Sequence, residues 1–308
     1  MGALVPKPSL TLGLTLALAL PLGVARAREP HSGVPVQLHA GQELVYQMHY
    51  RVERDTKTES RVIAPIAPPA EPIDLLRSVR VKVLEAGSGR VPGSTRLQVE
   101  IAPAGSPPES PARHVQFTLD AGGNVSDTDG IDSLTPGERE LWRDWVERFA
   151  AVWAFPPNLK PGQRWTSEEP VQDAVIAGLV WRKQLQYVRD EPCPRASAAS
   201  STPADTCAVV LSNATLSQKS SSKDSTPEEY KLHDLKTSGT ARGNNQIISY
   251  VSRASGVVVR VAETAVQTMD VTISKTDGSN AVSYHIAARS QSEILLTSSS
   301  AKEARPPI

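Results

Sequence analysis

The chain offers few residues whose types and spacing could perform catalysis or hold a metal ion. It contains no nucleophile elbow, no glycine-rich phosphate loop and no dinucleotide fingerprint. Ser220 and Lys223 have the Ser-x-x-Lys spacing of penicillin-recognising enzymes, but they lack the partner motifs of those enzymes. The six histidines are scattered, with no pair at the spacing of zinc ligands: His31, His39, His49, His114, His233 and His285. We therefore predict a non-enzymatic protein without a metal ion or cofactor, with a hydrolase as the least favoured alternative.

Carboxylates gather at two places. Asp127, Asp129 and Asp132 surround a glycine as in a calcium loop, but the distal bidentate glutamate of such loops is missing. An aspartate-rich turn before a helix explains the same residues, because negative charge is favoured at a helix N-terminus; calcium stays the minor alternative. Glu168 and Glu169 are adjacent, and adjacent strand residues point to opposite faces, which is poor geometry for sharing a catalytic proton.

Four of the five tryptophans lie within residues 135–165. At about 100° per residue, several of these aromatic residues would share one helical face. An aromatic stripe on a helix more often packs in the hydrophobic core than lines a ligand-binding site. If its packing against a curved sheet were incomplete, however, an apolar groove suited to an acyl chain would remain. The candidate residues for this groove are Trp142, Trp145, Phe149, Trp153, Trp165 and Trp181.

A helix near 136–154 must carry most of these aromatic residues. Thr135 is a suitable N-cap, Pro136 suits the first helical position, and Glu138 completes a capping box. The helix must end before Pro156, because the residue ahead of a proline is pushed out of the helical region.

Strands are predicted on both sides of this helix, from apolar residues at every second position. The polar run 217–245 is interpreted as a solvated insertion, and Asp277-Gly278 as the turn of a hairpin. The predicted fold is mainly β (α+β): a long, curved, half-barrel-like antiparallel sheet of about nine or ten strands, packed on one amphipathic helix. The main runs are 43–52, 78–86, 95–102, 114–120, 178–188, 207–216, 245–253, 256–275 and 281–296.

Residues 1–27 have the pattern of a cleaved secretory signal. Lys7 precedes an apolar run, and the small residues Ala25 and Ala27 favour cleavage after Ala27. An uncleaved anchor is the alternative, but the run is short for a membrane span and is interrupted by Pro21. We predict a secreted or periplasmic protein with one β-rich domain over 28–300 and a loose tail over 301–308.

The net charge and the apolar stretches limit the classes of partner that we expect, and the two cysteines predict a disulfide. Formal net charge is zero, so no global field favours nucleic acid, and no later stretch is long and apolar enough to span a bilayer. Cys193 and Cys207 bracket a small polar segment, and in an oxidising compartment such a pair favours a disulfide over a metal site or free thiols.

Two motifs carry a resemblance to known proteins. FTLDAGGNV (117–125), then a helix, then FPPNLKPGQRW (155–165) and long terminal strands resemble a group of uncharacterised secreted bacterial proteins without assigned activity. The layout is also similar to the lipoprotein-carrier architecture, in which a curved antiparallel sheet wraps around helices and holds lipid. That resemblance implies a hydrophobic small molecule or lipid as the partner.

The leading prediction is a non-enzymatic protein that binds a hydrophobic ligand or an envelope component between sheet and helix. The alternative is an envelope structural or interaction protein with a dry core and a protein partner.

Overall fold

The computed structural model describes residues 36–60, 71–87, 93–105, 112–156, 159–171, 174–194 and 205–300. The predicted signal segment 1–27 and the predicted tail 301–308 lie outside the described residues.

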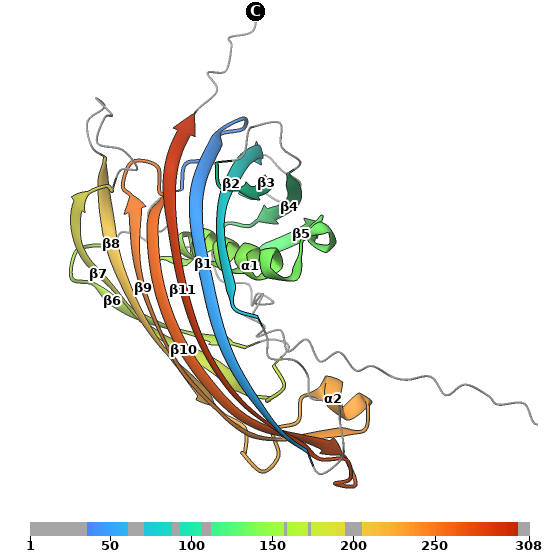
Figure 1. Ribbon diagram of the computed structural model, residues 1–308. Helices are drawn as coiled ribbons and strands as arrows, with labels where there is room; N and C mark the ends of the chain where they lie inside the picture. The colour runs from blue at the N-terminus through green and yellow to red at the C-terminus, as the bar shows by residue number, and fades with distance from the viewer. Residues whose placement is uncertain are drawn as a thin grey trace, which may run out of the picture.

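Eleven strands form one antiparallel sheet in the order β5-β4-β3-β2-β1-β11-β10-β9-β8-β7-β6. The sheet is long, strongly curved and not closed (Figure 1). The predicted mainly β fold class is therefore confirmed, with eleven strands instead of nine or ten. The strands are β1 (Glu43–Ser60), β2 (Ile73–Ala86), β3 (Thr95–Pro103), β4 (Arg113–Leu119), β5 (Val125–Asp129), β6 (Arg164–Pro170), β7 (Leu179–Pro192), β8 (Thr206–Gln218), β9 (Leu235–Ser252), β10 (Val258–Lys275) and β11 (Val282–Ser300).

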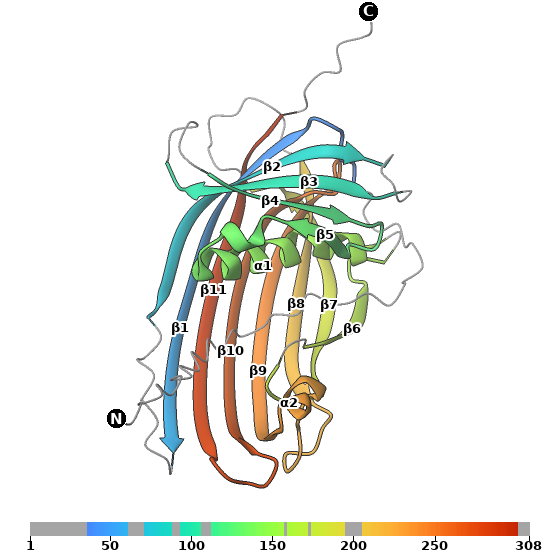
Figure 2. The same ribbon diagram turned by 90° about the vertical axis from the view of Figure 1, so that its right-hand side faces the viewer.

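The strand order explains why a helix crosses the sheet. The chain runs outward from β1 to the edge strand β5, and then resumes at the opposite edge with β6. Residues 130–163 make this connection between the two edges. The helix α1 within it lies across the concave face of the curved sheet (Figure 2).

Register shifts help the long strands to bend. Shifts occur between Val45 and Tyr46 of β1, between Val258 and Arg260 of β10, and between Tyr187 and Arg189 of β7. An extra residue on one strand increases the local twist and bends the strand.

The helix has the bounds that the sequence predicts. α1 spans Pro136–Ala150 and continues as the 3₁₀ turn η2 over Ala151–Ala154. Both halves of the capping box are present: the Thr135 side chain accepts from the Glu138 amide, and the Glu138 carboxylate accepts from the Thr135 amide at 3.0 Å. Two short helical elements without a sequence prediction accompany it, η1 (Ile131–Ser133) and α2 (Glu228–Leu232).

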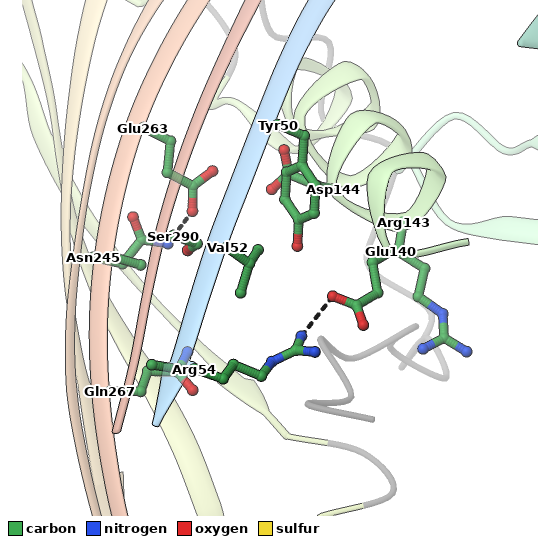
Figure 3. Close-up of a pocket in the computed structure, with 12 residues that line it drawn as sticks. Tyr50, Val52, Arg54, Glu140, Arg143, Asp144, Asn245, Glu263, Gln267 and Ser290 are labelled. Atoms are coloured by element: carbon green, nitrogen blue, oxygen red, sulfur yellow. Dashed lines mark hydrogen bonds and ion pairs between the residues drawn. The ribbon is translucent and has the colours of Figure 1, made fainter. Parts of the chain in front are cut away.

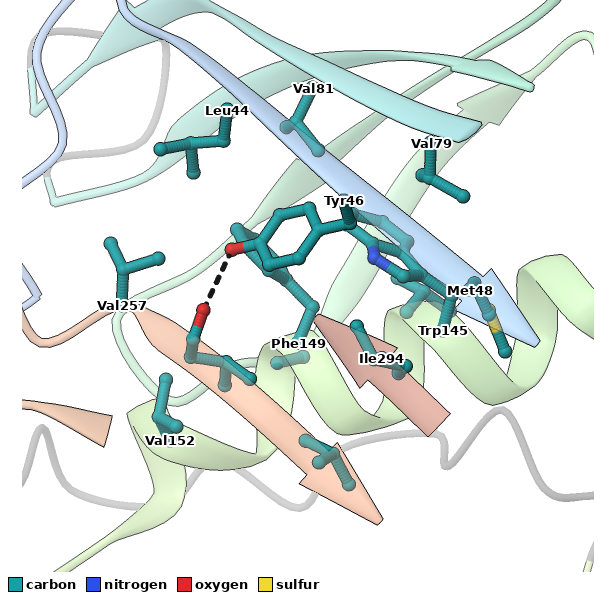
Figure 4. Close-up of a cluster of buried hydrophobic side chains, with 14 of the residues drawn as sticks. Leu44, Tyr46, Met48, Val79, Val81, Trp145, Phe149, Val152, Val257 and Ile294 are labelled. Carbon is teal, nitrogen blue, oxygen red and sulfur yellow. Dashed lines mark hydrogen bonds between the residues drawn. The ribbon is translucent and has the colours of Figure 1, made fainter. Parts of the chain in front are cut away.

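The main core lies between α1 and the upper half of the sheet (Figure 4). Trp145 stacks on Phe149 with ring centroids 4.8 Å apart, and both contact Tyr46 edge-on. The Tyr46 hydroxyl donates to the carbonyl of Val258 at 3.1 Å, which satisfies the one polar atom of its buried ring.

A second buried cluster lies lower on the concave face. Trp181 of β7 packs there with Leu216 of β8, Ala241 of β9 and Val271 of β10. Gly243 leaves room for the Trp181 indole, because a Cβ at this position would lie 3.0 Å from the Trp181 ring.

The interpretation of 217–245 as a solvated insertion is wrong in its second half. β9 starts at Leu235 and pairs with β10 down to the Lys275–Leu235 pair. Alternate β9 residues such as Ala241 and Asn245 are buried on the concave face, although the local sequence is polar and rich in glycine.

Candidate functional site

A small pocket lies between α1 and the concave face of the sheet (Figure 3). It offers about 40 Å³ to water-sized groups. Its lining residues come from α1, β1, β9, β10 and β11: Tyr50, Val52, Arg54, Glu140, Arg143, Asp144, Asn245, Glu263, Ala265, Gln267, Ala288 and Ser290.

The antiparallel register brings these residues together. A rung here means a row of directly paired residues on the concave face. The uppermost rung of the pocket joins Tyr50, Ser292 and Glu263. The next rung is Val52, Ser290, Ala265 and Asn245, and the third is Arg54, Ala288, Gln267 and Gly243. Successive rungs are two residues, about 7 Å, apart.

A buried ion cluster forms the upper wall of the pocket. The Arg148 guanidinium of α1 makes two hydrogen bonds to Glu263 of β10, one of them 2.7 Å from Nη2 to Oε1. It also lies 2.9 Å from the Glu147 carboxylate and 3.5 Å from that of Asp144. Lys183 of β7 reaches Glu147 at 3.5 Å. Lys183 also bonds Glu169 at 2.6 Å, so four carboxylates, three of them largely buried, share two cations.

Asp144 and Asn245 carry buried acceptors that this cluster does not satisfy. Asp144 Oδ2 and Asn245 Oδ1 have no hydrogen-bond partner among the described residues, and the Ser292 hydroxyl, which faces Asp144, has none either. The Asn245 amide nitrogen donates to Glu263 at 2.7 Å, which fixes the carbonyl end as the unpaired one. Burial, and then the nearby charge of Glu263, raise the pKa of the Asp144 carboxyl well above its ordinary value.

The lower rim of the pocket is an ion pair between helix and strand. Arg54 of β1 bonds Glu140 of α1 at 2.5 Å, with 14% and 17% of their side chains exposed. Above it, burial and the charge of Asp144 raise the pKa of Tyr50, so its phenol stays an uncharged donor and acceptor at neutral pH.

Below this rim the inward positions become mostly apolar. The fourth rung is Thr56, Ile286, Met269 and Ala241, and the fifth is Thr58, Tyr284, Val271 and Gly239. We call the β10 and β11 members of these two rungs the apolar strip: Met269, Val271, Tyr284 and Ile286. The strip begins one rung below Gln267 and Ala288, which line the pocket.

A larger and more open depression of about 610 Å³ lies at the lower end of the same strands; outward residues make up most of its lining, together with Gly239, Val271 and Tyr284 of the fifth rung. There His285 Nδ1 lies 2.6 Å from Asp270, and Lys57 is the cross-strand neighbour of His285. Such a dyad could orient an imidazole as a base, but no hydroxyl bonds its Nε2 within the described chain. Across the same residues no group of three His, Cys, Asp or Glu side chains could hold a metal ion.

The structure places the predicted groove residues mainly in the core. Trp142, Trp145 and Phe149 are at most 2% exposed within the main core, and Trp153 is half-buried against Phe149. Trp165 packs against Phe155, and Trp181 belongs to the second cluster. None of the six lines either of the two pockets described above. Their role as ligand contacts stays a prediction.

The predicted disulfide is confirmed. Cys193 and Cys207 are bonded, with Cα atoms 4.9 Å apart, at the end of the β7–β8 hairpin.

The residues of the pocket were missed by sequence reasoning, although one signal was present. Glu263 is in phase with Val261 and Ala265 along β10, so a charged residue occupies an inward position of an apolar strand. Because a buried charge needs partners, a glutamate at this position indicates a buried polar site on this rung.

Comparisons with known proteins leave the family unassigned. No protein-family model and no curated protein matches the chain. One similar solved structure is described as lipid-protein interactions in lipovitellin; the match has a TM-score of 0.39 at 9% identity and covers 88% of this chain and 27% of that chain. Another is the outer membrane protein OprG from Pseudomonas aeruginosa, with a TM-score of 0.17 at 7% identity over 84% of this chain and 97% of that one. Both TM-scores are too low to support a functional inference. Of the helices in the described residues, none has the length and apolarity needed to cross a membrane.

Proposed function

We propose that the protein binds an apolar molecule, such as one bearing an acyl chain, along the apolar strip of its concave face. The observation that carries this proposal is the continuation of the long strands beyond α1 with inward residues that are mostly apolar. α1 crosses the upper half of the sheet, whereas the strip lies on the lower half (Figure 2). Apolar surface on a concave face, next to a few convergent polar groups, is the usual setting of a small-molecule site.

The proposed binding is passive and takes place outside the cytoplasm. The N-terminal pattern supports export, and a disulfide supports an oxidising compartment. In this role the ion cluster fixes α1 on the sheet. Within the strip, Val271 and Ile286 are buried, so the half-buried Met269 and Tyr284 supply the contact area.

Two adjacent alanines of β11 provide a matched test. Ala288 is an inward residue that lines the pocket, and its neighbour Ala287 points outward. We expect Ala288→Trp to weaken displacement of a bound apolar dye by long-chain amphiphiles about tenfold or more, because the indole fills the site. Ala287→Trp should bind as the wild type does. Equal binding by both variants would contradict the proposal.

Thr56→Trp tests the same proposal if Ala288→Trp fails to fold. Thr56 is exposed and pairs with Ile286, so its indole would cover the strip without being forced into a core. Asp55→Trp is its outward control. Extraction of the purified protein with solvent, followed by mass spectrometry, should also recover an amphiphile. Recovery of a specific protein partner instead, with no amphiphile, would favour an envelope interaction protein.

A further inference from the structure

We propose that the pocket beneath α1 receives the polar end of the bound molecule, and that this end is a small hydrogen-bond donor, a hydroxyl or an ammonium group. This inference rests on the proposed function, since the chain of the same molecule would follow the apolar strip.

The first observation is the pair of unsatisfied acceptors. Asp144 is 2% exposed and Asn245 is 9% exposed, and each keeps one oxygen without a partner among the described residues. Leaving a buried polar group unpaired costs about 1–3 kcal/mol. Both residues line the pocket, so a donor in the pocket is the kind of group that their free oxygens would bond. An acceptor there would leave both oxygens unpaired and would find one unpaired buried donor in the described lining, Arg54 Nε.

The second observation is the charge of the walls. Asp144, Glu147 and Glu263 surround Arg148, and Lys183 lies 3.5 Å from Glu147 but 2.6 Å from Glu169, so the carboxylates outnumber the cations when all of these groups are ionised. The pKa of Asp144 is raised by its burial, and an ammonium in the pocket would favour its ionised form. At the rim, Arg54 is neutralised by Glu140. Arg143 also lines the pocket, but its guanidinium is directed away from Asp144 and from the strands (Figure 3). An anionic head group would therefore face buried carboxylates, whereas an ammonium would supply the missing positive charge.

The third observation is size. A space of about 40 Å³ holds about three or four water-sized groups, because one water needs about 10–15 Å³. A hydroxyl or an ammonium fits such a space. A phosphate ester or a sugar does not.

The pocket and the strip are also continuous along the strands. Gln267 and Ala288 form the lowest rung of the pocket, and Met269 and Ile286 form the next rung down. From Gln267 to Ile273 the inward face of β10 extends about 20 Å. Val271 is buried in the second cluster there, so an extended chain leaving the head group would contact the half-buried Met269 and Ile273.

Three probes with the same long alkyl chain test the proposal: the primary amine, the alcohol and the carboxylate. Each displaces an apolar dye from the full-length, disulfide-bonded protein at pH 7. We expect the amine and the alcohol to bind about tenfold or more tightly than the carboxylate. Asp144→Asn should reduce the preference for the amine, and Asn245→Leu should weaken both donor probes while the carboxylate is unaffected. Asp270→Asn on the outward face is the matched control and should change nothing.

The outcomes separate this inference from the proposed function. If the carboxylate binds most tightly, or if neither inward variant changes the order of the probes, the head-group assignment is wrong and the binding function stands. If no probe displaces the dye and no amphiphile is extracted, the proposed function itself is wrong. Asn245→Leu keeps the number and branching of the side-chain heavy atoms, so it decides the matter if Asp144→Asn fails to fold; thermal melting of each variant shows which case applies.

Discussion

At the scale of single residues, Arg148 is the cation that joins α1 to β10. Its side chain is 3% exposed and contacts Glu263, Asp144 and Glu147. We expect Arg148→Met to lower the free energy of unfolding by about 3–5 kcal/mol, because removing one partner leaves buried carboxylates without compensation. Denaturant unfolding at pH 7 measures the difference.

Arg143, on the same helix, is the control for this substitution. It makes no ion pair with any residue that the structure describes, so Arg143→Met should change the free energy of unfolding by less than about 0.5 kcal/mol. Similar losses from both substitutions would show that general helix charge, and not the buried pair, determines stability.

Asp144 should give stability an unusual dependence on pH. Burial and Glu263 raise the pKa of its carboxyl in the folded protein, while Arg148 opposes them. The folded state therefore keeps the proton of Asp144 to higher pH than the unfolded state does. The contribution of Asp144 to the free energy of unfolding falls as the pH rises from the ordinary aspartate range through the raised pKa. Glu147 of α1, Tyr50 of β1 and Ser292 of β11 also face this carboxyl.

We therefore expect Asp144→Asn to be at least as stable as the wild type at pH 7. Its advantage should shrink as the pH is lowered toward the ordinary aspartate range, where the wild-type carboxyl is protonated in both states. Denaturant unfolding from pH 4 to pH 8 measures this. An advantage that grows on acidification would have the opposite sign and contradict the raised pKa.

At the scale of elements, the start of α1 depends on one capping box. Burial acts to raise the pKa of Glu138, but hydrogen bonds from Thr135 and the guanidiniums of Arg113 and Arg77 outweigh it and hold the pKa below its usual value. A lowered pKa stabilises the fold above the ordinary glutamate range, and this stabilisation is lost as pH falls through the folded-state pKa.

Thr135→Ala should lower the free energy of unfolding by about 1 kcal/mol at neutral pH, because two hydrogen bonds at the N-cap are lost. Thr135→Ser keeps the hydroxyl and should retain most of the stability. The alanine variant should also lose less stability on acidification, since the Glu138 carboxylate has fewer bonds to lose. Chemical denaturation at pH 7 and pH 4 tests both statements, and equal losses by alanine and serine would exclude the capping hydroxyl as the cause.

The same elements show what sequence can and cannot predict. α1 was predictable because its signals are local: a cap, a proline at the first turn and an apolar face at helical spacing. The lower half of β9 was not, because its polar, glycine-rich residues have low strand propensity and become a strand only by pairing with β10. The sequence of β5 predicts a turn for a similar reason, since four of its five residues are polar or charged.

At the scale of the whole molecule, the pairing of β1 with β11 could not be read from the sequence. These strands come from opposite ends of the described chain and pair over most of their length. Alternation shows which face of each strand is buried, but not which strand lies beside it. The pocket depends on that order, because its rungs combine residues of β1, β11, β10 and β9. The disulfide was predictable because its two cysteines are close in sequence and their compartment could be inferred.

The disulfide joins the β7–β8 hairpin at the end opposite to the second cluster. Cys207 is buried and lies on β8, and Cys193 follows directly after the last residue of β7. β8 also pairs with β9 over the segment that includes Cys207. The bond therefore closes a loop in a hairpin that the sheet already holds in register, so we expect its loss to reduce stability without changing the fold.

Reduction of the disulfide should lower the free energy of unfolding by about 3 kcal/mol, because closing a loop of 14 residues restricts the unfolded chain by that amount. Comparing the reduced wild type with the double variant Cys193→Ala/Cys207→Ala distinguishes the stability lost with the S–S bond from the stability lost with the packing of the two sulfur atoms. The reduced protein keeps both sulfurs, so any further loss in the variant reports the cavity left at buried Cys207. Denaturant midpoints with and without reductant measure the first effect, and circular dichroism checks that the sheet persists. Identical midpoints for the oxidised and reduced wild type would show that the sheet alone restrains this hairpin.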